Sequence, residues 1–198
     1  VREALHRLKV NRLKYLPVVL KNKLVGIITE RELCRLIISH SVALSLSELY
    51  DCLLNTQVHE VMIKDPFTVT GDYSIEETAE RMLNHGLSIV PVVDNNWRLV
   101  GIITRSDIFS AILSLTGVGR EGTQFAVQIL ERPGSIKEVI DLMRSYGGRL
   151  YSILVTHQRV FKGSRKVYVR IQDLDRPSIK RLREELSAMG VLLYIIDH

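Results

Sequence analysis

The chain has 198 residues, of which 46% are hydrophobic and 25% charged, and its formal net charge at neutral pH is +5. This composition predicts one or two domains with a substantial hydrophobic core. No apolar run approaches the roughly 18 to 20 residues that a membrane-spanning helix needs, so we expect a cytoplasmic protein without such a helix. The two cysteines, Cys34 and Cys52, fit small buried hydrophobes in a reducing compartment better than a disulfide framework.

An internal repeat dominates the first 115 residues. The hexapeptide 24–29 returns letter for letter at 99–104, and the Pro-Val-Val at 17–19 returns at 91–93. Because one copy of a repeat cannot bury its apolar face alone, we expect the two copies to pack together around a cleft. Hydrophobic spacing predicts the order helix, strand, strand, helix in each copy, over 1–11, 15–20, 24–28 and 30–38 and again over 75–85, 89–93, 99–103 and 105–115.

The second copy has a preceding turn and strand at 61–69 that the first copy lacks, since the chain opens inside the first helix. By analogy we expect about 15 to 17 residues of the first copy to lie before Val1. Residues 39–57 form an insert with a predicted short helix over 47–54, and Ser45 and Glu48 give its capping signal. The predicted first repeat is therefore 1–54 and the second 55–116.

The C-terminal part differs in charge and in pattern. Residues 1–117 contain 13 basic and 13 acidic side chains, whereas 118–198 contain 14 and 9. Three glycines within 117–122 predict a linker. The remainder, 123–198, alternates as strand, helix, strand, strand, helix, strand, which predicts an antiparallel sheet with two helices on one face. The fold class is thus mixed α/β, with a repeated N-terminal module and a C-terminal βαββαβ domain.

One motif of the repeat combines a hydroxyl and a carboxylate at the start of a helix. Thr104 and Asp107 follow a strand and have the spacing of a capping box, in which the hydroxyl and the acid each accept from a backbone amide. A helix N-terminus also favours a phosphate, and a carboxylate one turn further can accept from both hydroxyls of a ribose. On the motif alone, capping remains the simpler interpretation.

Two such motifs in tandem, each after a Pro-Val-Val hairpin, resemble the cystathionine-β-synthase (CBS) domain, whose pairs (Bateman modules) are regulatory. The resemblance implies an adenosine-containing ligand between the repeats, with the threonine on phosphate and the acid on ribose. Glu32 replaces the usual aspartate of the first copy, so we favour the second site, and Lys14 and Arg105 are candidate phosphate partners. The implied nucleotide-binding residues are Thr68, Ser88, Ile89, Pro91, Thr104, Arg105 and Asp107 in the second copy and Lys14, Tyr15, Pro17, Thr29 and Glu32 in the first.

The C-terminal βαββαβ pattern, with Pro133-Gly134 at its first strand-to-helix turn, resembles the ferredoxin-like ACT domain, a sensor often used for amino acids. The resemblance implies a ligand loop at Glu131, Arg132 and Gly134, where helix amides can take a carboxylate. A plain tight turn is the alternative interpretation. Glu131 would repel a ligand carboxylate, which disfavours an amino acid.

The whole order, two CBS units, an insert and an ACT domain, resembles the AcuB family of acetoin-utilisation proteins. The resemblance implies a non-catalytic ligand sensor in acetoin or related carbon metabolism, working as a homodimer on a regulated enzyme. AMP, ADP and ATP are the expected ligands, with S-adenosylmethionine and NAD as alternatives. Amino-acid or other small-molecule sensing through the ACT domain, with the CBS pair as a dimerisation scaffold, is an alternative function.

Two further classes are disfavoured. The six histidines and two cysteines are scattered without metal-ligand spacing, and no nucleophile elbow or P-loop is present, so we expect neither an enzyme nor a metal site. A basic hairpin could contact nucleic acid, but four cations on one loop are more typical of a solvated tip. The residues of that hairpin tract are Arg159, Phe161, Lys162, Arg165 and Lys166.

Overall fold

A computed structural model describes residues 1–41, 45–119 and 121–197. The chain forms two compact units, Val1–Ile108 and Phe109–His198, and each is described here by itself. Within the described ranges, no helix is both long and apolar enough to cross a membrane.

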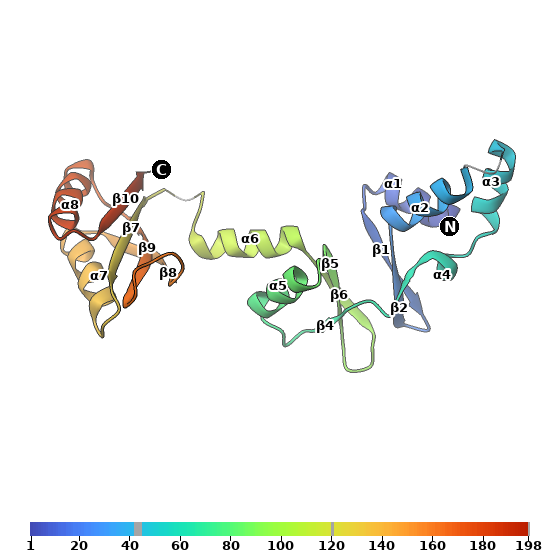
Figure 1. The fold of residues 1–198 in the computed structure, drawn as a ribbon, viewed down its shortest axis with the longest axis horizontal. Coiled ribbons are helices and arrows are strands. Elements are labelled where there is room, and N and C mark those ends of the chain that lie inside the picture. Colours follow the sequence, from blue (N-terminus) through green and yellow to red (C-terminus); the bar gives the residue numbers. More distant parts are fainter. Residues whose placement is uncertain (42–44, 120, 198) are drawn as a thin grey trace. The chain divides into compact units, whose positions relative to one another are not determined.

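The first repeat consists of α1 (Arg2–Val10), β1 (Tyr15–Leu20), β2 (Lys23–Thr29) and α2 (Glu30–Ser41), in the predicted order (Figure 1). β1 and β2 form an antiparallel hairpin in which Tyr15 pairs with Thr29. The helices cover this hairpin with a small core of Ala4, Leu8, Ile28 and Leu33. α2 extends three residues beyond its predicted end at residue 38.

The insert between the repeats is largely helical. It contains α3 (Leu46–Asn55), which is longer than predicted and begins with the predicted capping box of Ser45 and Glu48. Residues 42–44 of the insert lie outside the described residues. A short helix, α4 (Val58–Val61), and the two-residue strand β3 (Ile63–Lys64) follow. β3 pairs with β2, so the segment that precedes the second repeat completes the sheet of the first.

The second repeat consists of β4 (Val69–Thr70), α5 (Ile75–Asn84), β5 (Ile89–Val93), β6 (Leu99–Thr104) and α6 (Arg105–Thr116). β4 is parallel to β5, and β5 and β6 form an antiparallel hairpin. The two hairpins of the repeat share one irregularity, since the register shifts between Val18 and Val19 and again between Val92 and Val93. This common bulge supports the internal symmetry predicted from the repeated sequence.

The C-terminal unit has the predicted antiparallel sheet, with the strand order β10-β7-β9-β8. Both helices contribute to one core on one face of this sheet, as predicted (Figure 1). Phe125, Met143 and Leu182 are fully buried there, from a strand and from each helix. The elements are β7 (Thr123–Leu130), α7 (Ser135–Ser145), β8 (Arg149–Thr156), β9 (Ser164–Gln172), α8 (Arg176–Ala188) and β10 (Leu192–Asp197).

The division between the two compact units falls inside α6, after Ile108, rather than at the glycine-rich residues 117–122. Gly117 has a positive φ of 70°, and a Cβ there would lie 2.2 Å from the ring of Tyr151. A glycine is therefore required where α6 ends and the chain meets β8. The finer boundaries 1–54, 55–116, 117–122 and 123–198 stay predictions.

Candidate functional site

A cavity of about 870 Å³ lies within the N-terminal unit and is lined by residues of both repeats. It lies where β1 and β5 begin and where α2 and α6 begin, because each hairpin brings its strand start close to the helix that follows. The amide of Glu30 donates to Lys14 O, and the amide of Arg105 donates to Ser88 O, each over 3.2 Å. This repeated bond closes the same turn in both copies.

The first turns of two twelve-residue helices line this single cavity. α2 contributes Glu30, Arg31 and Glu32, and α6 contributes Arg105 and Ser106. The first amides of a helix have no partner within the helix, and the helix dipole places partial positive charge at that end. The cavity is therefore lined by the positive ends of two helix dipoles, which is the environment that anionic groups favour.

Each helix start is also closed by its threonine and its acid. The Thr104 hydroxyl donates to Asp107 Oδ2 over 2.7 Å, and the Thr104 amide donates to the same oxygen over 2.8 Å. These hydrogen bonds hold the pKa of Asp107 below its usual value. In the first copy the Thr29 hydroxyl donates to Glu32 Oε2. The longer glutamate thus makes the same contact with its threonine as the aspartate of the second copy.

Tyr15, in the first repeat, contacts the threonine motif of the second. Burial raises the pKa of its phenol, the charge of Asp107 raises that pKa further, and a hydrogen bond with Thr104 lowers it. The equivalent residue of the second copy is Ile89, which has no hydroxyl. The two halves of the cavity are therefore chemically unequal.

Apolar side chains form the other part of the lining. Ile27 and Ile63 pair across β2 and β3, so the β3 segment brings one apolar side chain next to another at the cavity wall. The ring of Phe67 stacks on His85, with 5.0 Å between ring centroids and 27° between planes. This contact holds an aromatic wall in place before any ligand binds. The apolar residues that line the cavity are Leu13, Ile27, Ile63, Pro66, Phe67, Leu87 and Ile89.

The cavity brings together eight of the twelve residues predicted to bind a nucleotide. Pro17 and Pro91 lie two residues further along β1 and β5 and do not line it. Asp107 is also absent from the lining and reaches the cavity only through its bonds to Thr104. The eight lining residues are Lys14, Tyr15, Thr29, Glu32, Ser88, Ile89, Thr104 and Arg105.

Thr68 lies elsewhere. It lines a smaller hollow of about 230 Å³ together with Tyr73 and Trp97. The reason is the strand pairing, because β4 runs beside Val92 and Val93 at the far end of β5 from Ile89. Thr68 therefore lies toward the end of the β5–β6 hairpin that is opposite to the Thr104 and Asp107 motif.

Sequence reasoning missed part of the lining. Arg12 and Arg31 lie beside predicted residues but have no distinctive motif of their own. Ile63 and Phe67 come from the start of the second repeat, and the pairing of β3 with β2 brings Ile63 to the cavity. The repeat nevertheless indicated the position of the site, because the cavity lies beside the segments that are most similar between the two copies.

Comparison with known proteins identifies the N-terminal module. Residues 1–39 and 58–114 match the family model of the CBS domain. The N-terminal part of the chain is a tandem pair of CBS domains.

The chain is similar to other proteins over roughly half of its length. Protein MJ1426 of Methanocaldococcus jannaschii is 29% identical over 126 residues, which are 52% of this chain and 75% of that protein. The crystal structure of MJ1225 from the same organism is 28% identical with a TM-score of 0.50, covering 56% of this chain and 40% of that one. A crystal structure of CBSX2 in complex with AMP is 28% identical with a TM-score of 0.48, covering 59% and 83%.

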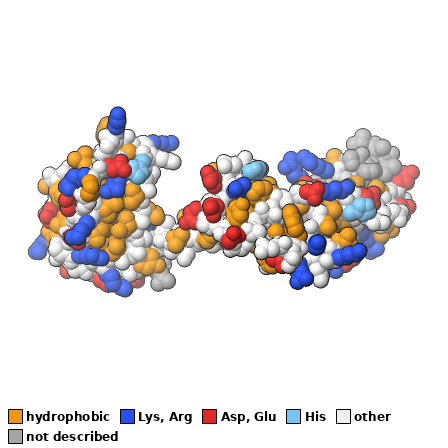
Figure 2. All heavy atoms as spheres, turned by 90° about the horizontal axis from the view of Figure 1, so that it is seen from below, with side chains coloured by type: hydrophobic (Ala, Val, Ile, Leu, Met, Phe, Trp, Pro, Cys, Tyr) orange, Lys and Arg blue, Asp and Glu red, His pale blue; other side chains and the backbone are white. Residues whose placement is uncertain are grey.

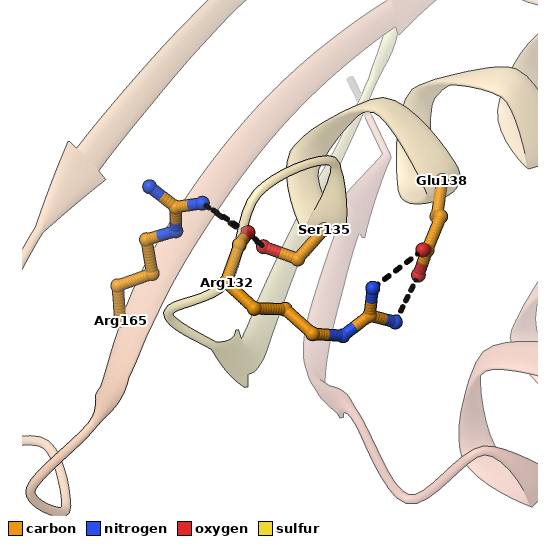
Figure 3. A network of polar contacts seen from close by, with 4 residues as sticks. All are labelled: Arg132, Ser135, Glu138 and Arg165. Atoms are coloured by element: carbon orange, nitrogen blue, oxygen red, sulfur yellow. Dashed lines mark hydrogen bonds and ion pairs between the residues drawn. The ribbon is translucent and has the colours of Figure 1, made fainter.

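The charged side chains of the C-terminal turn predicted as a ligand loop contact other residues of the same unit, and Figure 3 shows those of Arg132. Arg132 forms a two-bond ion pair with Glu138. His157 Nε2 lies 3.0 Å from Glu131 Oε1. Gly134 has a φ of 85° and precedes α7 without any side-chain cap. Arg165 donates to Ser135 Oγ over 2.9 Å, while its buried Nε has no hydrogen-bond partner. Arg132 is thus already ion-paired, and Glu131 already has a hydrogen-bond partner in His157.

The basic side chains of the predicted hairpin differ in whether they contact another described residue. Arg165 is used at the start of α7, whereas Arg159, Lys162 and Lys166 enter none of the ion pairs among the described residues. Phe161 is 79% exposed. In the described part of the chain, no group of three or more His, Cys, Asp or Glu side chains is placed to hold a metal ion.

Proposed function

We propose that this chain is a non-catalytic regulatory sensor that binds an adenosine-containing nucleotide in the cavity between its CBS repeats. The observation that carries the proposal is the presence of both helix starts, α2 and α6, in the wall of one cavity. CBS pairs are regulatory modules that sense adenosine-containing ligands. The volume of about 870 Å³ also lies in the range typical of small-molecule sites.

The chemistry of the wall suits the parts of a nucleotide. The apolar side chains, Phe67 and Ile89 among them, offer a flat and hydrophobic surface to a base. Thr29 and Thr104 place hydroxyls at the positive ends of two helix dipoles, which suits phosphate oxygens. Asp107 and Glu32 can accept from ribose hydroxyls, provided that the ligand replaces the threonine contacts that each now makes.

Signalling follows from the asymmetry of the cavity. A nucleotide that binds at the Thr104 hydroxyl competes with the hydrogen bond between Thr104 and Tyr15, which belongs to the other repeat. Binding is thereby coupled to the relative arrangement of the two repeats, to the extent that the ligand prefers one arrangement over the other. We expect the response to reach a regulated enzyme through a homodimer. Exposed apolar side chains on the C-terminal unit support self-association (Figure 2), among them Leu154, Tyr194 and Ile196.

A thermal-shift screen of the full chain tests this function. AMP, ADP, ATP, NAD and S-adenosylmethionine are compared with a set of amino acids. A ligand at about 100 times its dissociation constant adds roughly 2.7 kcal/mol to the free energy of unfolding. Stabilisation by an adenosine compound supports the proposal, and stabilisation by amino acids alone contradicts it.

A second candidate is a ligand site at the start of α7, in the unit that resembles an ACT domain. The uncapped helix start and the unpartnered Nε of Arg165 favour it, since both lack an acceptor. An amino acid that stabilises the wild type but not Arg165→Ala would support this site. The domain order also suggests a role in acetoin metabolism, which we include in the proposed regulatory function. Identification of the regulated enzyme would test that role.

A further inference from the structure

The charge around the cavity indicates which nucleotides it selects, an inference that rests on the proposed function. Four cationic side chains line it, against two carboxylates. The partial positive charge of two helix starts adds to this excess. The cations are Arg12, Lys14, Arg31 and Arg105, and the carboxylates are Glu30 and Glu32.

These cations differ in the hydrogen bonds and ion pairs that their side chains already make within the protein. Arg105 is fixed on the loop before β5, because its Nε donates to Leu87 O over 2.8 Å and its Nη2 to Gly86 O over 3.2 Å. Across residues 1–41, 45–119 and 121–197, the side chains of Arg12, Lys14 and Arg31 take part in no ion pair. One of the two carboxylates, Glu32, already accepts from Thr29. The hydroxyl contact leaves the charge of Glu32 in place, so the lining carries four cations against two carboxylates.

The unpaired cations all belong to one side of the cavity. Arg12 and Lys14 come from the turn between α1 and β1, and Arg31 comes from the first turn of α2. The second repeat contributes the ring of Phe67 and the first turn of α6. A nucleoside held against the second repeat would therefore extend its phosphates toward the unpaired cations of the first.

We propose that the cavity selects nucleoside di- and triphosphates over nucleoside monophosphates and over S-adenosylmethionine. The phosphate chain runs from the start of α6 to Lys14 and Arg31, so each added phosphate gains charge-assisted contacts that a monophosphate lacks. S-adenosylmethionine carries a sulfonium and an ammonium against one carboxylate, so its net charge has the same sign as the cavity lining.

Calorimetric titration of the full chain with AMP, ADP, ATP, S-adenosylmethionine and inorganic tripolyphosphate tests this selection, without divalent cations and at two salt concentrations. The dissociation constant is expected to fall with each added phosphate, and the difference between AMP and ATP is expected to shrink at high salt. Loss of a charged contact in Lys14→Ala or Arg31→Ala should raise the dissociation constant of ATP about tenfold or more. A monophosphate held at the start of α6 would not extend to these side chains, so the same variants should change the dissociation constant of AMP by less than about twofold.

Lys23→Ala is the matched control, because Lys23 is an exposed first-repeat cation that does not line the cavity. Equal affinity for AMP and ATP, or equal weakening of both by Lys14→Ala and Arg31→Ala, would overturn the selection while leaving nucleotide sensing intact. Tripolyphosphate that binds as tightly as ATP would overturn the nucleoside part of the proposal. Failure of every adenosine compound to bind would instead remove the proposed function itself.

Discussion

The hydroxyl of Thr104 donates to Asp107 over 2.7 Å, and the backbone amide of Asp107 donates back to that hydroxyl over 3.2 Å. This reciprocal contact is a helix cap, and it is also the edge of a cavity that both repeats line. The capping and ligand-binding interpretations of the motif are therefore compatible in one structure. The two interpretations predict different effects when the Asp107 carboxylate is removed.

Asp107→Ala should remove both a cap and a ligand contact. Loss of a capping side chain costs about 0.5 to 2 kcal/mol in the free energy of unfolding. The variant should in addition lose most of the stabilisation that ATP gives the wild type, as measured by thermal shift. Asp175→Ala is the matched control, since Asp175 caps α8 through the Ser178 amide in the other unit. If both variants retain the full nucleotide effect, Asp107 is a cap only.

The lowered pKa of Asp107 predicts a pH dependence of stability. Since hydrogen bonds from Thr104 lower the native pKa of Asp107 below its ordinary value, the ionised carboxylate stabilises the folded state at neutral pH. That contribution is complete above the unfolded pKa and is lost as the pH falls through the native one. The difference in melting temperature between wild type and Asp107→Asn should therefore be constant from about pH 7 to 5 and shrink below about pH 4. A difference that grows on acidification would contradict this sign.

Two equivalent glycines of the repeat should respond differently to the same substitution. A Cβ at Gly26 would lie 2.4 Å from Met62 Sδ and 2.9 Å from Ile63 O, whereas at Gly101 its nearest neighbour is Val92, at 3.8 Å. Gly26→Ala should destabilise by about 1 to 3 kcal/mol because it forces β3 away from β2. Gly101→Ala should change the free energy of unfolding by less than about 0.5 kcal/mol. Urea denaturation compares them, and similar losses in both would argue against the pairing of β3 with the first repeat.

The two units have separate cores, and each should be destabilised separately. Phe125 and Leu33 are both fully buried, one in each unit. Phe125→Ala should cost about 3 to 5 kcal/mol in the C-terminal unit, and Leu33→Ala about 2 to 5 kcal/mol in the N-terminal one. Trp97, the only tryptophan of the chain, reports on the N-terminal unit by fluorescence. Its transition should move in Leu33→Ala and stay in place in Phe125→Ala, while circular dichroism detects both. A shift of the fluorescence transition in both variants would show that the units unfold together.

Much of the fold was predictable because it depends on local patterns. The repeated hexapeptide placed two hairpins and the helices that follow them, and both hairpins occur in the predicted order. The Pro133-Gly134 turn and the glycines at 147 and 148 bounded α7, and the alternation around Phe125 identified β7. These signals concern neighbours in sequence, where spacing and turn chemistry decide the structure.

The site was predictable only in part because its wall depends on contacts between distant segments. Tyr15 and Thr104 are 89 positions apart, and nothing in either local sequence indicates that they touch. Thr68 was expected at the same site, but the parallel pairing of β4 with the far end of β5 places it elsewhere. Such placements follow from strand pairing, which a local pattern does not specify.

Hydrogen–deuterium exchange of the full chain with and without ATP tests the central claim most directly. If the nucleotide binds between the repeats, the amides at the starts of α2 and α6 should exchange more slowly when ATP is present, in peptides that contain Arg31 and Ser106. Peptides around Ser135, at the start of α7, should exchange at an unchanged rate. Protection confined to the start of α7, or no protection at Arg31 and Ser106 under saturating ATP, would contradict a nucleotide site between the repeats.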